Sequence, residues 1–323
     1  MTELTKTDLD EIKFNIEARL EEFSLESLKQ EPRTHLGISE IGENCSRKLW
    51  YKFRWFAFEE FSGRMLRLFQ RGHREEERYI NYLEAIGCKV YRFYNPILNY
   101  HPESDDYFLS SQFEPGDGLV EDVTGLPRHE DEATKRGLKR QQFRVAGVNG
   151  HYGGSCDGVV ILPWYPDIPF IGEFKTHNAK SFIGYVNDGL VKSKPKHYDQ
   201  MCGYGYHMQI QYGLYFPENK NDDDIQVTPI KLDWNRGRQL ELKAHDIITA
   251  KEPPQRISDN PSFFECKYCT FTKHCHEQAI PQKNCRSCRM SEPVENAEWK
   301  CNLYKDIIDK EFIKKGCEQW API

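Results

Sequence analysis

The stretch YGGSCDGVVILPWYPDIPFIGEFKT, residues 152–176, decides the fold of this chain. Glu173 and Lys175 lie two positions apart on the strand predicted over residues 170–176, so their side chains share one face of it. Asp157 lies on the second arm of a preceding predicted hairpin. If the two strands are neighbours, two carboxylates and a lysine converge at one place.

Helices and strands are expected to follow one another around this stretch, which predicts an α/β fold with a mixed sheet. Asn149-Gly150 between two extended runs is typical of a hairpin. Helices are expected near residues 63–85, 196–209 and 236–250, and further strands near 210–216 and 225–232. The apolar spacing over residues 5–29 predicts an N-terminal amphipathic helix. Residues 101–140 lack periodicity, and residues 101–135 carry ten acidic side chains against two basic ones, so we expect an acidic surface insertion or a mobile loop there.

The composition limits the class of protein. A chain of 323 residues can form one large decorated domain or two smaller ones. It has no apolar run long enough to span a membrane and no signal sequence at its start, so we expect a protein of the reducing cytoplasm, whose 11 cysteines are thiols or metal ligands. The net charge of −6 argues against a general polyanion-coating protein, so DNA would bind through local basic patches.

The two carboxylates and the lysine are residue types that can act together in a metal site. Asp157 and Glu173 could jointly hold Mg²⁺ or Mn²⁺, which prefer oxygen ligands. Lys175 could orient or help deprotonate a metal-bound water, and the ion would stabilise charge on a phosphate oxygen. A Glu-x-Lys pair is common on exposed strands, but Glu173 is flanked by apolar residues, where a carboxylate without a partner is costly. These residues therefore predict a metal site for phosphodiester hydrolysis.

A wider set of residues resembles a known family. Gln200 and Tyr204 lie one turn apart on the predicted helix 196–209 and share a face. The residues that carry the match are His73, Asp157, Glu173, Lys175, Gln200 and Tyr204. Over roughly residues 38–280 the chain resembles the RecB-like branch of the PD-(D/E)xK nucleases, which implies a restriction-endonuclease-like core with a mixed central sheet flanked by helices. The resemblance further implies that the histidine and the two acids hold the metal, that the lysine assists the attacking water, and that the glutamine and tyrosine contact substrate or brace the site.

The cysteines form two groups. Three of the first group follow the spacing Cys266-x2-Cys269-x5-Cys275, and Cys45 precedes a basic and aromatic segment. This pattern is similar to the iron-sulfur nucleases of the same branch, which implies that these four residues bind a [4Fe-4S] cluster tying the two ends of the nuclease domain together. The spacing alone leaves a zinc site open, with His274 or His276 as a ligand.

The second cysteine group lies in the short C-terminal tail. Its members are Cys285, Cys288, Cys301 and Cys317. Four thiolates in a tail with little core of its own predict a structural zinc site, because metal binding can supply the folding energy. Free or redox thiols are the alternative. Cys88, Cys156 and Cys202 are expected to be buried.

Basic segments are candidates for contact with DNA. Residues 45–54 alternate basic and aromatic side chains, which suits single-stranded nucleic acid. Lys192, Lys194, Lys196 and His197 open the helix that carries Gln200. The arginines of residues 63–85 form one stripe, which is either a solvated face or a ridge that contacts phosphates.

These features together predict a metal-dependent deoxyribonuclease, most simply an exonuclease, in DNA end processing or recombination. The expected division is an N-terminal helical segment (1–35), a nuclease domain closed by the iron-sulfur cluster (36–280) and a zinc-binding tail (281–323). DNA is the expected partner, and the tail could bind a protein. The alternative is a catalytically silent DNA-binding or adaptor protein that uses the tail for its partner.

Overall fold

A six-stranded mixed sheet positions the stretch 152–176. The computed structural model describes residues 5–28, 31–92, 97–110, 121–123, 126–138 and 142–323. In sheet order the strands are β11 (Asp224–Ile225), β10 (Tyr212–Asn219), β9 (Tyr165–His177), β8 (Gly158–Leu162) and β2 (Lys89–Tyr91), and β12 (Thr228–Lys231) also pairs with β10. β9 and β10 are parallel whereas β8 and β9 are antiparallel, so the predicted α/β fold with a mixed sheet is confirmed.

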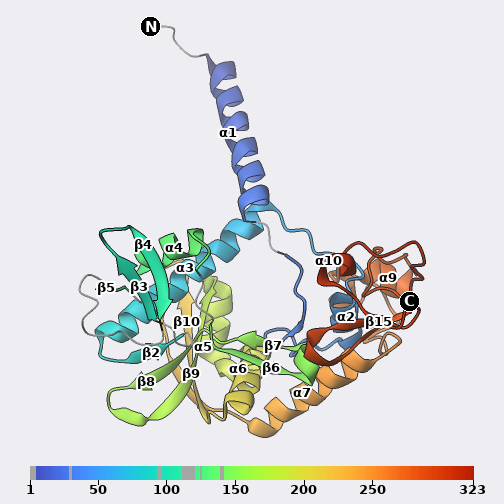
Figure 1. The fold of residues 1–323 in the computed structure, drawn as a ribbon. Coiled ribbons are helices and arrows are strands. Elements are labelled where there is room, and N and C mark those ends of the chain that lie inside the picture. The colour runs from blue at the N-terminus through green and yellow to red at the C-terminus, as the bar shows by residue number, and fades with distance from the viewer. Residues whose placement is uncertain (1–4, 29–30, 93–96, 111–120, 124–125, 139–141) are drawn as a thin grey trace.

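Helices cover both faces of this sheet (Figure 1). They are α3 (Gly63–Ala85), α5 (Ala179–Ser193), α6 (Pro195–Met208) and α7 (Trp234–Thr249). α3 lies on one face, where Tyr79 stacks with Phe174 of β9 at 5.9 Å between ring centroids. α5 and α6 lie on β9 and β10, and α7 packs on α6. Three of these helices begin and end within two residues of the prediction; α5 had no clear signal in the sequence.

A second, three-stranded sheet lies beside the first. Its strands are β1 (Leu36–Gly37), β7 (Tyr152–Ser155) and β6 (Arg144–Gly147), in the order β1-β7-β6. β6 and β7 form the predicted hairpin, joined by the short helix η1 (Val148–Gly150). Because β7 leads directly through Asp157 into β8, the two sheets meet at the proposed site.

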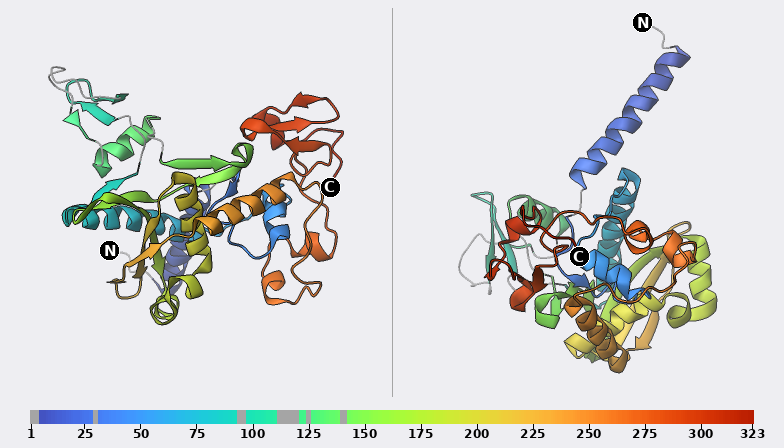
Figure 2. Two further views of the ribbon diagram at one scale, coloured as in Figure 1. Left: turned by 90° about the horizontal axis from the view of Figure 1, so that it is seen from below. Right: turned by 90° about the vertical axis from the view of Figure 1, so that its right-hand side faces the viewer.

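Where the structure describes it, the acidic insertion consists of short strands and one helix, so the mobile loop, one of the two expectations, is wrong for that part. Its elements are β3 (Ile97–His101), β4 (Asp106–Ser110), β5 (Glu121–Asp122) and α4 (Pro127–Lys135). The three strands form their own sheet over a small core of Leu98, Val123 and Ala133. Figure 2 shows this unit projecting from the main body. The rest of the predicted insertion, residues 111–120, 124–125 and 139–140, lies outside the described residues.

The N-terminal helix α1 (Lys6–Ser27) extends away from the body (Figure 1). Thr5 and Asp8 form a capping box, which confirms the predicted start. The apolar side chains of the helix are exposed, for example Phe14 at 70% and Phe23 at 58%. Only its C-terminal part lies against α3, where Arg67 donates a hydrogen bond to Ser24.

The C-terminal residues fold into short elements around α2 (Ser46–Phe53). These elements are α8 (Phe264–Lys267), α9 (Thr272–His276), β13 (Ser291–Pro293), η2 (Glu295–Ala297), β14 (Trp299–Cys301), β15 (Asp306–Ile307) and α10 (Lys310–Ile313). β13, β14 and β15 form a third small sheet. Trp299 of β14 is 2% exposed and belongs to the same buried cluster as Trp50 and Phe53 of α2.

Among the helices of the described residues, not one combines the length and the apolar character that crossing a membrane requires.

Candidate active site

The structure brings Asp157, Glu173 and Lys175 together. β8 and β9 pair with Gly158 opposite Gly172, which puts Asp157 next to Glu173 across the two strands. Lys175 Nζ lies 2.6 Å from Glu173 Oε1 and 3.4 Å from Asp157 Oδ2. The backbone N–H of Phe174 also donates to Asp157 Oδ2, at 3.0 Å. The convergence predicted from strand alternation is therefore present.

Glu173 is a buried carboxylate with a cation beside it. Its side chain is 0% exposed, and Gln200 Nε2 donates to its Oε2 at 2.9 Å. The other oxygen, Oε1, accepts no hydrogen bond of normal geometry within the described structure, although the ammonium of Lys175 lies against it. Burial raises the pKa of Glu173 to about 8, and the charge of Lys175 opposes that rise.

Lys175 is held in its charged form by the two acids. Burial lowers the pKa of Lys175, but the charges of Asp157 and then Glu173 outweigh burial and raise this pKa above its ordinary value. The side chains of Lys175 and Asp157 remain 28% and 15% exposed. The pair is thus accessible from solvent, whereas Glu173 forms the floor behind it.

Tyr204 braces the strand that leads to Asp157. Its hydroxyl donates to the backbone carbonyl of Ser155 at 2.7 Å. A Cβ on Gly154 would lie 2.7 Å from that hydroxyl, so the close approach requires glycine at this position. Burial raises the pKa of Tyr204, and the phenol therefore acts as a hydrogen-bond donor.

His73 is not in contact with the acids. Its side chain is 72% exposed and its Nδ1 lies 3.8 Å from Glu76 Oε1, one turn further along α3. The neighbouring carboxylate of Glu76 raises the pKa of His73, and the charge of Asp157 adds to this shift. The sequence analysis missed Glu76, whose charge acts on both Glu173 and Lys175. Its position three residues after His73, on the same helix face, is the signal that could have identified it.

The donor set of this site suits a divalent ion. An oxygen of a buried carboxylate that faces a cation and accepts no hydrogen bond is a ligand that a metal would satisfy. Within the described residues, however, no three His, Cys, Asp or Glu side chains are spaced to share one ion. The ligand set expected from the resemblance, His73 with Asp157 and Glu173, is therefore not gathered around one point.

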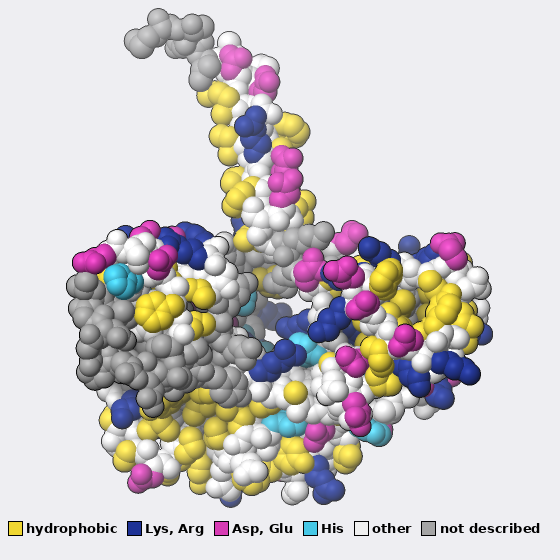
Figure 3. Space-filling model, viewed as in Figure 1, with side chains coloured by type: hydrophobic (Ala, Val, Ile, Leu, Met, Phe, Trp, Pro, Cys, Tyr) yellow, Lys and Arg dark blue, Asp and Glu magenta, His cyan; other side chains and the backbone are white. Residues whose placement is uncertain are grey.

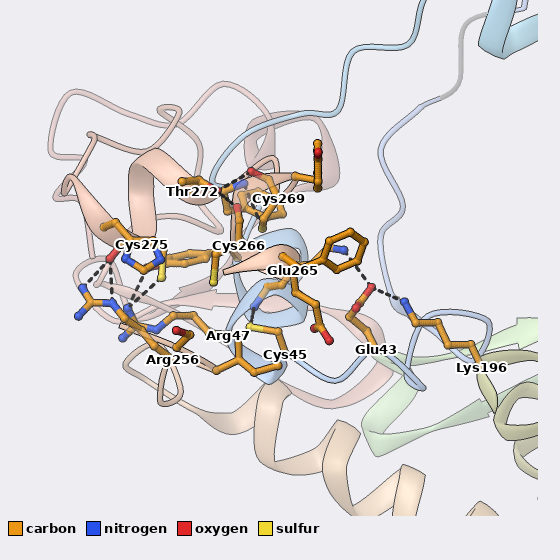
Figure 4. Close-up of a pocket in the computed structure, with 18 residues that line it drawn as sticks. Glu43, Cys45, Arg47, Lys196, Arg256, Glu265, Cys266, Cys269, Thr272 and Cys275 are labelled. Atoms are coloured by element: carbon orange, nitrogen blue, oxygen red, sulfur yellow. Dashed lines mark hydrogen bonds and ion pairs between the residues drawn. The ribbon is translucent and has the colours of Figure 1, made fainter. Parts of the chain in front are cut away.

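The first cysteine group lines a single pocket. Cys45 precedes α2, whereas the other three lie on and around α8 and α9, so segments more than 200 residues apart in the chain meet here. Together with other side chains, four cysteines line this cavity of about 320 Å³ (Figure 4), but within the described residues no three of them are spaced to share one metal ion. They are Cys45, Cys266, Cys269 and Cys275. Lys48 N–H donates to Cys45 Sγ and Phe271 N–H donates to Cys269 Sγ, both at 3.4 Å. Burial raises the pKa of Cys269 and that of Cys266.

Basic side chains border the same pocket. Arg47 Nη1 lies 3.8 Å from Cys275 Sγ, and Glu43 binds both Lys48 and Lys196 at 2.9 Å (Figure 4). Because Lys196 belongs to α6, Glu43 connects the cysteine pocket to the helix that carries Gln200 and Tyr204.

The tail cysteines are near one another as well. Burial raises the pKa of Cys285 to about 11, and the charges of Cys317, Cys288 and Cys301 add to that rise. The four sulfurs are thus close enough to interact electrostatically, without the spacing of a single-ion site. Cys88, Cys156 and Cys202 are buried, as predicted.

The aromatic residues of segment 45–54 do not form a surface for stacking on bases. Trp50, Tyr51 and Phe53 are at most 3% exposed, and Arg54 is 2% exposed. Helix α2 packs with them against α7 and the C-terminal elements, so the apolar side chains that suggested DNA stacking belong to the core.

The arginine stripe of α3 serves at least partly in packing. Arg67 binds Ser24 of α1, and Arg78 forms an ion pair with the buried Glu218 of β10. The second basic segment does lie near the site, because Lys194 donates to Ser181 of α5 and His197 precedes Gln200 by one turn of α6.

Comparisons with known proteins gave matches among solved structures alone. No family model and no curated protein matches the chain. The crystal structure of SSO0001 is similar with a TM-score of 0.39 and 13% identity, covering 80% of this chain and 94% of that one. The alkaline exonuclease LHK-Exo from Laribacter hongkongensis is similar with a TM-score of 0.38 and 16% identity, covering 67% and 87%. The complex of LHK-Exo with dAMP gives a TM-score of 0.38 and 16% identity, covering 66% and 86%.

Proposed function

We propose that this protein is a divalent-metal-dependent nuclease that hydrolyses phosphodiester bonds in DNA, acting as an exonuclease in end processing or recombination. The observation that carries the proposal is the buried carboxylate of Glu173, in contact with Lys175 and adjacent to Asp157. Two carboxylates and an ammonium around one accessible point are what metal-assisted hydrolysis of a phosphate requires.

Each residue of the site would have its own role in hydrolysis. Asp157 and Glu173 would hold Mg²⁺ or Mn²⁺, whereas His73 would reach the ion only after its exposed side chain turns from Glu76 toward Asp157. The ion, once bound, lowers the pKa of a bound water and stabilises negative charge on the phosphate. Lys175 would orient the attacking water, Gln200 fixes the carboxylate of Glu173, and Tyr204 holds the strand that carries Asp157.

Two further metal centres belong to the proposal as structural elements. A [4Fe-4S] cluster on Cys45, Cys266, Cys269 and Cys275 would join α2 to the C-terminal elements, and the cavity between these cysteines supports it. Zn²⁺ on Cys285, Cys288, Cys301 and Cys317 would stabilise the tail, which could then also bind a protein partner. Neither centre takes part in hydrolysis.

The activity is tested with end-labelled DNA and Mg²⁺ or Mn²⁺. Glu173→Gln and Lys175→Met are expected to lower the cleavage rate by roughly 100-fold or more, because each removes charge from the reacting centre. Asp167→Asn is the matched control, since Asp167 is an exposed acid on the same strand β9. Cleavage that persists without metal, or that is equal in all variants, would refute the proposal.

The metal centres are tested by elemental analysis of the intact protein purified without oxygen. Iron and an absorption shoulder at about 400 nm are expected in the wild type, and both should be lost in Cys266→Ser. Zinc should be lost in Cys288→Ser, whereas Cys88→Ser, in a buried cysteine outside both groups, should lose neither metal. Zinc without iron in the wild type would reject the cluster.

A further inference from the structure

Two large aromatic side chains are exposed beside the pocket of the first cysteine group. Phe264 of α8 is 75% exposed, and Tyr268, one helical turn further along, is 72% exposed. Their rings lie edge to face with 5.7 Å between the centroids, and both residues line the pocket. Single exposed apolar residues are common on protein surfaces, but two adjacent large rings form an apolar patch, which is typical of a binding site. We refer to Phe264 and Tyr268 as the aromatic pair.

The backbone that carries the aromatic pair is fixed by two other segments. Asn44 Nδ2 donates to Glu265 Oε1 at 2.9 Å. Thr272 Oγ1 lies within hydrogen-bonding distance of the backbone carbonyls of Cys266 and Cys269. Asn44 precedes α2 and Thr272 begins α9, so α8 is held from both sides. A backbone fixed in this way keeps the two rings next to each other before a ligand binds, which lowers the cost of binding.

Basic side chains lie beside the aromatic pair. Lys267 is exposed, and its Nζ lies 5.4 Å from the centroid of the Tyr268 ring. Figure 3 shows hydrophobic side chains exposed next to Lys and Arg side chains over the C-terminal elements, where Figure 1 has α9 and α10. Among the described residues, the lining of the pocket includes Arg47, Lys48, Lys196 and Arg256, with Glu43 and Glu265 as acids. This excess of basic side chains favours a polyanion.

The acids near the aromatic pair are partly compensated within the protein. Glu43 binds Lys48 and Lys196, each at 2.9 Å. Asp259 lies 3.6 Å from Arg256. Because the cations that face these acids are engaged, stacking on the rings rather than charge would provide most of the affinity for a nucleic acid.

The pocket also borders the helix of the candidate active site. Lys196 lines the pocket and belongs to α6, on which Gln200 lies four residues, about 6 Å, further along. Gln200 in turn donates to Glu173. Figure 4 shows Lys196 reaching from α6 toward Glu43 at the edge of the pocket. The pocket thus lies between the aromatic pair and the helix that contacts the catalytic acid.

We propose that the aromatic pair stacks on the bases of single-stranded DNA that extends from the catalytic acids over the cysteine pocket. The bases of a single strand have exposed faces, whereas those of a duplex are already stacked on one another. Lys267 contacts a phosphate of the same strand. The inference rests on the proposed nuclease function and names single-stranded DNA as the form of substrate that the protein holds. The aromatic pair provides the stacking surface that the buried residues of segment 45–54 do not.

The test compares the binding of a fluorescent oligo-dT with that of a fluorescent abasic oligomer of the same length, in buffer without Mg²⁺ or Mn²⁺. Phe264→Ala with Tyr268→Ala is expected to weaken binding of oligo-dT by about tenfold or more. It should leave the affinity for the abasic oligomer within about twofold of the wild type, because that oligomer has phosphates but no bases to stack. Lys267→Gln should instead reduce the slope of log K against log salt for oligo-dT by about 0.7, the contribution of one phosphate contact.

The matched control is Tyr304→Ala with Phe312→Ala, which removes one tyrosine and one phenylalanine that are 62% and 60% exposed elsewhere in the C-terminal elements. It should keep the wild-type affinity, and Phe264→Trp with Tyr268→Trp should retain binding of oligo-dT. An unchanged affinity of Phe264→Ala, Tyr268→Ala for oligo-dT would overturn the inference and leave the rings to a protein partner. An equal loss for the abasic oligomer, or a wild type that binds neither oligomer, would also overturn it. Failure of the nuclease proposal appears separately, as cleavage that Glu173→Gln does not change.

Discussion

The side chain of Gln200 connects helix α6 to the buried acid of the site. Its amide is the hydrogen-bond donor to Glu173 Oε2, at 2.9 Å, inside a region where an unpaired carboxylate oxygen is costly. We expect Gln200→Ala to lower the cleavage rate by roughly 10- to 100-fold and to raise the metal concentration needed for half-maximal activity, as losses of ligand-orienting residues do.

The control for this prediction is Gln239→Ala, because Gln239 is exposed on α7. Titration of Mn²⁺ in the cleavage assay separates the two effects. An unchanged metal requirement in Gln200→Ala would show that Gln200 does not orient Glu173.

Two histidines next to the site should make the fold sensitive to acid. Tyr215 bridges His177 Nε2 at 2.8 Å and His197 Nδ1 at 2.7 Å. Burial lowers the pKa of His177 to about 4 and that of His197 to about 3. In the unfolded chain these histidines take up a proton near pH 6.5. The stability that their neutral rings contribute to the fold is therefore present above pH 6.5 and is lost as the pH falls toward 4.

Each histidine contributes up to about 1.4 kcal/mol of this loss per pH unit. His197→Gln should therefore reduce the decrease in Tm between pH 6.5 and 4.5, whereas His245→Gln, in a ring that is 58% exposed, should not. Melting curves at several pH values provide the measurement. If the Tm of His197→Gln and that of the wild type fell in parallel with pH, protonation of His197 would not be a cause of the acid sensitivity.

At the scale of elements, α6 and α7 approach closely through a glycine. A Cβ on Gly237 would lie 2.5 Å from the backbone oxygen of Cys202 and 2.5 Å from Tyr206 Cβ. Gly237→Ala must separate the two helices, so we expect a loss of about 1–3 kcal/mol in the free energy of unfolding. Because α6 carries Gln200 and Tyr204, cleavage should fall as well.

Gly184 gives the opposite expectation. It lies inside α5, and a Cβ there would meet nothing within 4 Å. Gly184→Ala should therefore raise the stability by about 0.5–1 kcal/mol, because alanine restricts the unfolded chain more than glycine does. Chemical denaturation measures the free energy of unfolding of Gly237→Ala and Gly184→Ala. If both substitutions changed it in the same direction, the close contact between α6 and α7 would not explain the effect of Gly237→Ala.

At the scale of the whole molecule, Arg286 joins the C-terminal tail to the body. It is 1% exposed, and its guanidinium lies 4.4–4.8 Å from the ring centroids of Phe53, Trp55 and Trp299. Burial, with the charge of Arg54 adding to it, lowers the pKa of Arg286 well below its ordinary range, so the stabilising contacts are offset by a cost of desolvation.

Arg286→Ala would leave a cavity between the rings, and we expect it to destabilise the fold by roughly 2–4 kcal/mol. Arg286→Met fills most of that space without a buried charge and should cost less. Arg289→Ala is the control, since Arg289 is exposed and binds the carbonyl of Pro322; its effect should stay within about 0.5 kcal/mol. If the Met variant is as unstable as the Ala variant, the hydrogen bonds to Arg33 and Thr34 matter more than packing.

The local sequence pattern was sufficient to predict most helices and strands and the convergence of Asp157, Glu173 and Lys175, but not the position of His73. Alternation along one strand predicted that Glu173 and Lys175 face one side, and the local residue pattern located α3 and α6. The strands and the helix inside the acidic insertion were not predicted, because its small core of Leu98, Val123 and Ala133 is too sparse to produce a periodic signal. The exposure of His73 depends on how α3 sits on the sheet, which helix periodicity alone does not specify.

By itself, the sequence determined the strand and helix pattern, the face shared by Glu173 and Lys175, and the two cysteine groups, because these depend on residues close together in the chain. Only the tertiary structure decided which distant groups meet. The contact of Gln200 with Glu173 joins residues 27 positions apart, and Arg286 meets the Arg33 segment across 253. Such contacts depend on the packing of whole elements, and that packing also buried the aromatic residues of 45–54 and placed Arg144 beside His35.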